Sequence, residues 1–245
     1  MNQRKVLFFI PFSVLVLALS FCNTACANTN ETPRQSNDTI IVPIVATDEV
    51  GEVKTDSQCI EIKDITNEVS YGHNPEAKPN VDVIVLHSCY HADSPDTFSI
   101  EGVIKQFIQY DVASHYLIAR DGLILRLVSE DHVAWHAGKS ALPTTKRTGL
   151  NATSIGIETI CSKWNGPTEE QYTALAGLVN DICERYEINY IVSHEDIAPT
   201  RRSDPWCFNW NRFKAKLSEK ALFAISKRDR FPKPKLTEKQ RRTRM

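Results

Sequence analysis

The stretch Val81-Asp82-Val83-Ile84-Val85-Leu86-His87 decides the fold class of this chain. It is an apolar, β-branched run of strand length, and a histidine ends it. A second run of the same kind, Tyr190-Ile191-Val192-Ser193, is followed by His194, and Asp204 comes ten residues later. Open α/β sheets present functional groups at the carboxyl ends of their strands, so both histidines are predicted to lie in a functional site.

Strands and helices are predicted to alternate around these two runs. The expected strands are 81–88, 114–120, 123–129, 154–160 and 189–194, and the expected helices are about 99–110, 168–186 and 209–217. Arg120-Asp121-Gly122 has the composition of a tight turn, which predicts an antiparallel hairpin. The fold class is therefore predicted to be α/β, with a mixed central β-sheet flanked by helices in a single catalytic domain.

The helix expected from residue 168 has the clearest local pattern. Thr168 and Gln171 have the spacing of a capping box directly after Pro167. The apolar residues that follow recur at helical spacing along one face, namely Leu175, Leu178, Val179, Ile182 and Tyr186. This helix is predicted to pack on the sheet as a scaffold.

Residues 1–27 are predicted to be a secretory signal peptide. Two positive charges, Arg4 and Lys5, precede an apolar run over residues 6–21, and Ala25-Cys26-Ala27 gives a small-x-small end. We expect cleavage after Ala27 and export to the periplasm or the cell wall.

A lipid-anchored form is the alternative for this N-terminal segment, with Cys22 or Cys26 as the modified residue. Phe21 is bulky where lipoprotein signals have a small residue, and Asn23 is polar where they have an aliphatic one. No second apolar run approaches the roughly 20 residues that span a bilayer. We therefore expect a protein that is soluble or peripherally held after export.

Three further segments follow the signal peptide. Residues 28–58 are polar without a sustained period and are predicted to be a flexible spacer, and residues 59–226 are predicted to be the domain. Residues 227–245 form a basic tail with nine Lys or Arg against Asp229 and Glu238, a net charge of +7. Since the whole chain carries −1 and the signal peptide +2, residues 28–226 carry −10.

The basic tail has two interpretations. It could hold the protein peripherally on anionic wall polymer or lipid headgroups, or it could be a solvated terminus. We expect no nucleic acid as partner, because only Phe231 is interleaved with the charges. Five cysteines remain after cleavage, so at least one is unpaired within the chain; these are Cys59, Cys89, Cys161, Cys183 and Cys207.

His87, His194 and Asp204 have the composition of a catalytic zinc site. Such sites have three protein ligands and keep a fourth position for water. Two neutral imidazoles and one carboxylate leave a net charge of +1 at zinc, which lowers the pKa of bound water toward about 7. Zn²⁺ is therefore the expected cofactor.

Five segments extend this pattern into a family resemblance. Their order and spacing resemble those of the zinc-dependent N-acetylmuramoyl-L-alanine amidases, the type-2 amidases that include AmpD-like enzymes and peptidoglycan recognition proteins. The segments are Val85-Leu86-His87, Ser114-His115-Tyr116-Leu117-Ile118, Ala134-Trp135-His136-Ala137-Gly138, Ser154-Ile155-Gly156-Ile157-Glu158 and His194-Glu195-Asp196-Ile197-Ala198-Pro199. The resemblance covers about residues 80–217 and implies a peptidoglycan or muropeptide substrate.

The third metal ligand has alternatives. Asp204 precedes Pro205, where the resembling enzymes have their ligand, whereas Cys207 lies three residues beyond it. His91 could replace a ligand only if its segment were helical, which the β-branched residues before it disfavour. Asp204 is therefore the predicted ligand.

Two further residues are predicted to be catalytic. The resemblance places Glu158 beside the zinc water, and a buried carboxyl with a raised pKa suits a general base that later protonates the leaving amine. Arg202 occupies a position where the family commonly has lysine. A guanidinium stays charged and cannot donate its proton, so Arg202 is predicted to stabilise the oxyanion.

Three residues are predicted to bind substrate: His115, Trp135 and His136. A histidine can hydrogen-bond a carbonyl, and indole offers an apolar face to a sugar ring. For His115 a structural role in the core is an equal alternative. Trp206 replaces a residue that is usually glycine in the family and is expected to reshape the cleft.

The resemblance implies an exported zinc amidase that cuts between N-acetylmuramic acid and L-alanine. The alternative is a non-catalytic peptidoglycan-binding module of the same fold, which usually lacks a zinc ligand. A thiol hydrolase based on Cys89 or Cys161 with His91 or His115 is a second alternative, although no third group is available to orient such a pair.

Overall fold

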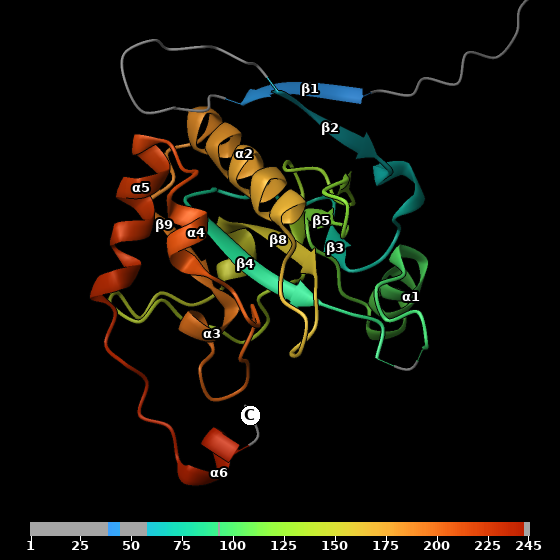
Figure 1. Ribbon diagram of the computed structural model, residues 1–245. Helices are drawn as coiled ribbons and strands as arrows, with labels where there is room; N and C mark the ends of the chain where they lie inside the picture. Colours follow the sequence, from blue (N-terminus) through green and yellow to red (C-terminus); the bar gives the residue numbers. More distant parts are fainter. Residues whose placement is uncertain (1–38, 45–57, 93, 243–245) are drawn as a thin grey trace, which may run out of the picture. The chain divides into compact units, whose positions relative to one another are not determined.

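The structure is a computed structural model that describes residues 39–44, 58–92 and 94–242. Its main feature is a seven-stranded sheet in the order β1-β2-β6-β5-β8-β4-β9 (Figure 1). The strands are β1 (Thr39–Ile44), β2 (Gln58–Asp64), β4 (Val83–Cys89), β5 (Tyr116–Ile118), β6 (Ile124–Arg126), β8 (Ser154–Ile160) and β9 (Tyr190–Ser193). A second, two-stranded sheet pairs β3 (His73–Asn74) with β7 (Val133–Ala134).

The larger sheet is mixed, as predicted. β4 pairs in parallel with β8 on one side and with β9 on the other. β5 pairs in parallel with β8 and antiparallel with β6, which confirms the predicted hairpin. Gly122 has a φ of 87° in its turn, a conformation that suits glycine. The hairpin strands are shorter than the sequence indicated.

Helices cover both faces of the sheet. The helices are α1 (Ile100–Tyr110), α2 (Glu169–Arg185), α3 (His194–Ile197), α4 (Trp210–Lys214), α5 (Glu219–Ser226) and α6 (Glu238–Arg242). Short 3-10 turns are η1 (Thr66–Glu68), η2 (Leu150–Thr153) and η3 (Arg228–Arg230). Side chains of α2, α4 and α5 share one apolar core with the sheet, and those of α1 belong to another.

Alternation along β4 decides on which face the first histidine lies. Ile84 and Leu86 are buried in the core beneath α2, whereas Val83 and Val85 belong to a separate cluster. Successive side chains of a strand point to opposite faces. His87 therefore lies on the face opposite α2.

The start of α2 confirms the predicted capping box. The Gln171 amide donates to Thr168 Oγ1 at 3.1 Å, and the Thr168 amide donates to Gln171 Oε1 at 3.0 Å. The Gln171 side chain is fully buried and also donates to the carbonyls of Ile118 and Ile160. The cap therefore joins the helix to the sheet as well as closing its first turn.

Four of the described segments differ from the prediction. Residues 28–58 contain β1, which pairs with β2, so this part is not a spacer without structure; the other residues before Gln58 lie outside the described residues. β2 and α5 were not predicted. Residues 227–231 of the basic tail pack on the domain, with Phe231 against one of its apolar clusters.

No helix among the described residues has the length and apolar character needed to cross a membrane. The predicted signal peptide, residues 1–27, lies outside this part of the chain.

Candidate metal centre and active site

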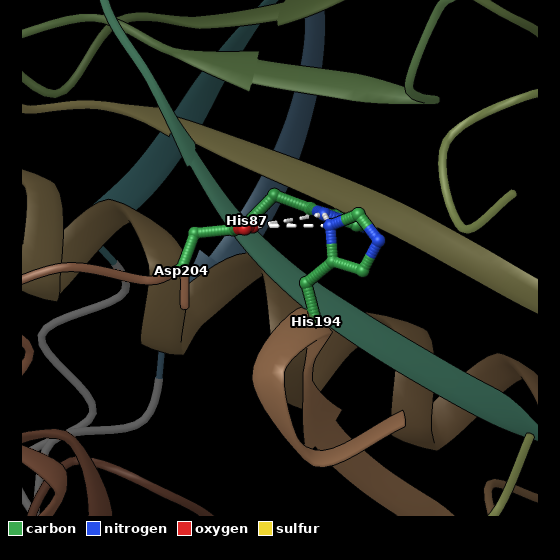
Figure 2. A group of neighbouring side chains, drawn as sticks. All are labelled: His87, His194 and Asp204. Atoms are coloured by element: carbon green, nitrogen blue, oxygen red, sulfur yellow. Dashed lines mark hydrogen bonds and ion pairs between the residues drawn. The ribbon is translucent and has the colours of Figure 1, made fainter. Parts of the chain in front are cut away.

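Neighbouring strands bring the two histidines together. His87 lies near the carboxyl end of β4, and His194 begins α3 directly after β9. Because Leu86 is paired with Ser193 in the parallel register, the residues that follow them are neighbours. Asp204 comes from the loop after α3, and Figure 2 shows the three side chains pointing toward one another.

The potential ligand atoms are close and buried. Nδ1 of His87 lies 2.9 Å from Nδ1 of His194, and Oδ2 of Asp204 lies 3.4 Å from the first and 3.2 Å from the second. The three residues are 1%, 5% and 6% exposed. Within the described part of the chain, they form the group of histidines, cysteines and carboxylates that could hold a metal ion.

A chain of hydrogen bonds fixes the tautomer of His87. The Ser154 hydroxyl donates to the Leu150 carbonyl at 2.5 Å, so its oxygen accepts from Nε2–H of His136 at 3.3 Å. Burial beside His87 holds the pKa of His136 well below its ordinary value, so its Nδ1 is free of a proton. That nitrogen accepts from Nε2–H of His87 at 2.9 Å. Nδ1 of His87 therefore keeps its lone pair.

His194 is oriented in the same way. Its Nε2 lies 3.3 Å from the Ala137 carbonyl, which can only accept, so this nitrogen carries the proton. In the neutral form of this ring, Nδ1 then presents a lone pair to the group. Metal-binding histidines commonly donate their second ring N–H to such a partner.

Protonation states complete the donor set. Burial, together with His194, lowers the pKa of His87 to about 4, so its ring is neutral at neutral pH. Burial alone would raise the pKa of the Asp204 carboxyl, but the two adjacent histidine rings lower it below its ordinary value, so the group is a carboxylate at neutral pH. Two imidazole lone pairs and a carboxylate thus converge without a proton between them, an arrangement that fits a Zn²⁺ ion.

A glycine provides the space for His136. A Cβ atom at Gly156 would lie 2.4 Å from Cγ of the His136 ring. No side chain tolerates that distance, so any substitution at Gly156 must displace the ring that bonds His87. The packing of the His136 ring therefore requires glycine at position 156.

Ser154→Ala is expected to weaken zinc binding by about tenfold, because it removes the acceptor that orients His136 and, through it, His87. The measurement is zinc titration of the metal-free protein against a competing chelator. Ser140→Ala is the matched control, since this buried hydroxyl donates to the Gly138 carbonyl and not to a histidine. Equal affinities for both variants would contradict the orienting role.

Glu158 stands beside the metal ligands. It is paired with His87 in the parallel register of β8 and β4. Its Oε2 is buried and has no hydrogen-bond partner among the described residues. Burial and the charge of Asp204 raise its pKa to about 8. The side chain is thus a proton acceptor and donor in the neutral pH range.

A cavity of about 200 Å³ opens onto this group of residues. Six of the predicted functional residues line this cavity: Glu158, His194, Asp204, Arg202, Trp135 and His136. Trp206 also lines the cavity, and its indole Nε1 donates to Ser203 Oγ at 3.1 Å. Trp206, where the family usually has glycine, therefore adds an aromatic side chain to the wall of the cavity.

His115 does not reach the cavity, which corrects its predicted role in binding substrate. The ring is fully buried. Its Nδ1 accepts from the Gly156 amide at 3.0 Å, and its Nε2–H donates to the His132 carbonyl at 3.2 Å. Both nitrogens bond backbone groups of other segments, so the structural alternative applies. His136 lines the cavity, but its ring nitrogens likewise bond protein groups, and it orients His87.

The alternative ligands lie apart from the metal group. Cys207 is exposed, and its thiol donates to the Lys163 carbonyl at 3.1 Å. The His91 ring packs where a side chain at Gly102 of α1 would be. Neither residue belongs to the described group that could hold a metal ion.

A thiol nucleophile is not favoured either. Burial and the nearby Glu158 raise the pKa of the Cys89 thiol well above its ordinary value, and burial raises that of Cys161 to about 11. Both sulfurs are therefore protonated at neutral pH, whereas a nucleophilic cysteine requires the thiolate.

These features define a class of protein: an α/β domain with a His-His-Asp group that could hold a metal ion and a buried carboxyl at the same cavity. The chain belongs to the N-acetylmuramoyl-L-alanine amidase family, which it matches over residues 77–207. The match begins just before β4 and ends just after Asp204, so it contains every residue of the metal group.

Individual relatives agree with this assignment. The chain is 41% identical over 107 residues to the 1,6-anhydro-N-acetylmuramyl-L-alanine amidase AmpD of Citrobacter freundii, covering 42% of this chain and 56% of that protein. It is 38% identical over 155 residues to the N-acetylmuramoyl-L-alanine amidase AmiD of Escherichia coli K12, covering 56% of this chain and 53% of that protein. The chain thus spans about half the length of these curated relatives.

A solved structure shares the fold. The crystal structure of a selenomethionine derivative of AmpD aligns with a TM-score of 0.51 and 32% sequence identity, covering 61% of this chain and 92% of that one. The mixed sheet with helices on both faces is therefore the fold of a known amidase structure.

Proposed function

We propose that this chain is a zinc-dependent amidase that hydrolyses the bond between the lactyl group of N-acetylmuramic acid and L-alanine in peptidoglycan or muropeptides. The observation that supports it most is the convergence of two imidazole lone pairs and the Asp204 carboxylate beside the unpartnered oxygen of Glu158. The names of AmpD and AmiD support the same bond and substrate class.

Three residues of the cavity have a part in this reaction beside the metal ligands. Zinc held by His87, His194 and Asp204 would supply an activated water and polarise the scissile carbonyl. Glu158 takes up the proton released in the attack and returns it to the leaving amine of L-alanine, for which a pKa of about 8 is suitable. Arg202, at the same cavity, stabilises negative charge on the amide oxygen. Trp135, which is 39% exposed, offers an apolar face to the sugar.

Digestion of purified peptidoglycan tests this function. The zinc-loaded protein should release stem peptides that begin with a free alanine amine and leave glycan with free lactyl groups, both identified by mass spectrometry. Zinc content should approach one ion per chain. A protein that binds peptidoglycan without cleaving it would instead be the non-catalytic module.

We further propose that the protein acts on the wall outside the cytoplasm. This rests on the sequence of residues 1–27, with its charged start, apolar run and small-x-small end. The lipid-anchored form remains the alternative. Mass spectrometry of the mature N-terminus distinguishes cleavage after Ala27 from a lipid-modified cysteine.

The basic tail is proposed to assist contact with anionic wall polymer. Replacing Lys233, Lys235 and Lys239 by glutamine should weaken sedimentation with intact sacculi at low salt, because exposed charges act over about a Debye length. Activity on soluble muropeptides should change little.

The matched control for the tail has the same loss of charge elsewhere: Lys63, Lys78 and Lys105 replaced by glutamine. Added salt should remove the difference between the two triple variants. Equal sedimentation of both at low salt would identify the tail as a solvated terminus.

A further inference from the structure

The first residues of the basic tail are fastened to the domain. We call residues 227–231 the C-terminal strap. Lys227 Nζ donates to Asn189 Oδ1 at 3.2 Å. Phe231 packs against Tyr190 with ring centroids 6.2 Å apart, in the apolar cluster of the β9 strand. The strap therefore lies along the segment that leads into the metal ligand His194.

Arg228 makes the polar contact between the strap and α3. Its Nε donates to Asp196 Oδ2 at 2.5 Å, and the two side chains are only 20% and 15% exposed. Its guanidinium carbon also lies 3.7 Å from the centroid of the Trp210 ring. A planar guanidinium satisfies both contacts at once, which an ammonium group cannot do equally well.

Asp196 closes the first turn of α3. Its Oδ2 accepts from the Ser193 amide at 2.8 Å, and its own amide donates to Ser193 Oγ at 3.0 Å. This capping box surrounds His194, the first residue of the helix. A helix of four residues has few hydrogen bonds of its own, so its position depends on such contacts.

The same turn also holds the third ligand. The Glu195 amide donates to the Asp204 carbonyl at 2.9 Å. A displacement of the α3 turn would therefore move His194 directly and Asp204 through its backbone. Arg228 reaches this turn from a part of the chain that lies beyond the matched family segment, residues 77–207.

We propose that Arg228 is a positioning residue for the metal centre, acting through Asp196 on the α3 turn that presents His194 and supports Asp204. The proposal rests on the zinc site of the proposed function. In this proposal the C-terminal strap affects zinc affinity through one specific side-chain contact. The net charge of the tail has no part in this effect.

The test measures zinc affinity of metal-free protein by competition with a chelator, together with the free energy of unfolding of the same metal-free protein in urea. Arg228→Met should weaken zinc binding by about tenfold, the lower end of the effect of residues that support metal ligands. Arg228→Lys should recover part of the loss. Arg230→Met is the matched control, because Arg230 is an exposed arginine of the same strap, and it should bind zinc like the wild type.

A double-mutant cycle with Asp196→Asn separates positioning from general loss of structure. If Arg228 acts through Asp196, the double variant should bind zinc about as weakly as the weaker single variant. Unchanged zinc affinity in Arg228→Met, with or without a lower unfolding free energy, would overturn the proposal, and so would additive losses in the cycle. A wild-type protein that binds no zinc would overturn the metal site itself, and the positioning role with it.

Discussion

Replacing His87 by alanine is expected to abolish amide hydrolysis and to remove most of the bound zinc. Only His194 and Asp204 would remain as ligands, and two ligands neither hold zinc tightly nor fix the geometry that activates water. In this variant Nδ1 of His136 also loses the hydrogen bond that it accepts from Nε2–H of His87. Zinc content by atomic absorption and release of stem peptide from muropeptides measure the two effects.

His91→Ala is the matched control for this substitution. It removes a histidine four residues further along, whose ring lies against α1 and outside the metal group. It should keep one zinc per chain. Stoichiometric zinc and full activity in the His87 variant would exclude His87 as a ligand.

Glu158→Gln is expected to keep zinc and to lower turnover by about 100-fold or more, the scale of general acid–base catalysis. Glutamine has nearly the same size as glutamate, and Glu158 is not among the three converging ligand residues. The glutamine side chain cannot, however, take up or return a proton. Steady-state kinetics on a soluble muropeptide, with zinc analysis of the same sample, provide the measurement; loss of zinc along with activity would contradict the assignment.

The same substitution should alter the pH dependence of stability in the metal-free protein. Burial and Asp204 raise the pKa of Glu158 from 4.5 to about 8, so the folded wild type binds the additional proton between these values. Its unfolding free energy therefore falls relative to the glutamine variant as pH rises from about 5 to about 8, by at most about 1.4 kcal/mol per pH unit. Urea unfolding of both proteins across this range checks the sign.

Local patterns predicted much of the fold. The capping box of Thr168 and Gln171 and the apolar face behind it located α2, because a helix start depends on residues close in sequence. The runs ending in His87 and His194 located β4 and β9 for the same reason.

Among the elements that were not predicted, β2 and α5 were missed for different reasons. In β2, buried Ile60 and Ile62 alternate with Glu61 and Lys63, a strand pattern that the sequence does contain. In α5, buried Ala224 and Ile225 stand beside exposed Leu222 and Phe223, so apolar residues occupy both faces and the helical period is obscured.

The metal group agrees with the predicted residues, but the roles of the other histidines depend on register. His115 and His136 each lie within a family motif, and both were predicted to bind substrate. Their ring nitrogens bond groups from other segments, such as the Gly156 amide and Ser154 Oγ. Sequence spacing does not specify such pairings, and the same limit applies to Arg228 and Asp196.

The three proposed ligands lie far apart in the sequence, so they are synthesised at different times. His87 and His194 are 107 residues apart, and Asp204 comes ten residues after His194. A growing chain therefore contains only one of the three ligands for most of the time in which the domain is made. Since unfolded chains rarely preform a metal site, a zinc ion would enter only after the segment that carries His194 and Asp204 has been made. In the zinc amidase that we propose, zinc binding would thus follow the synthesis of all three ligands and would draw on the zinc of the compartment where folding is completed.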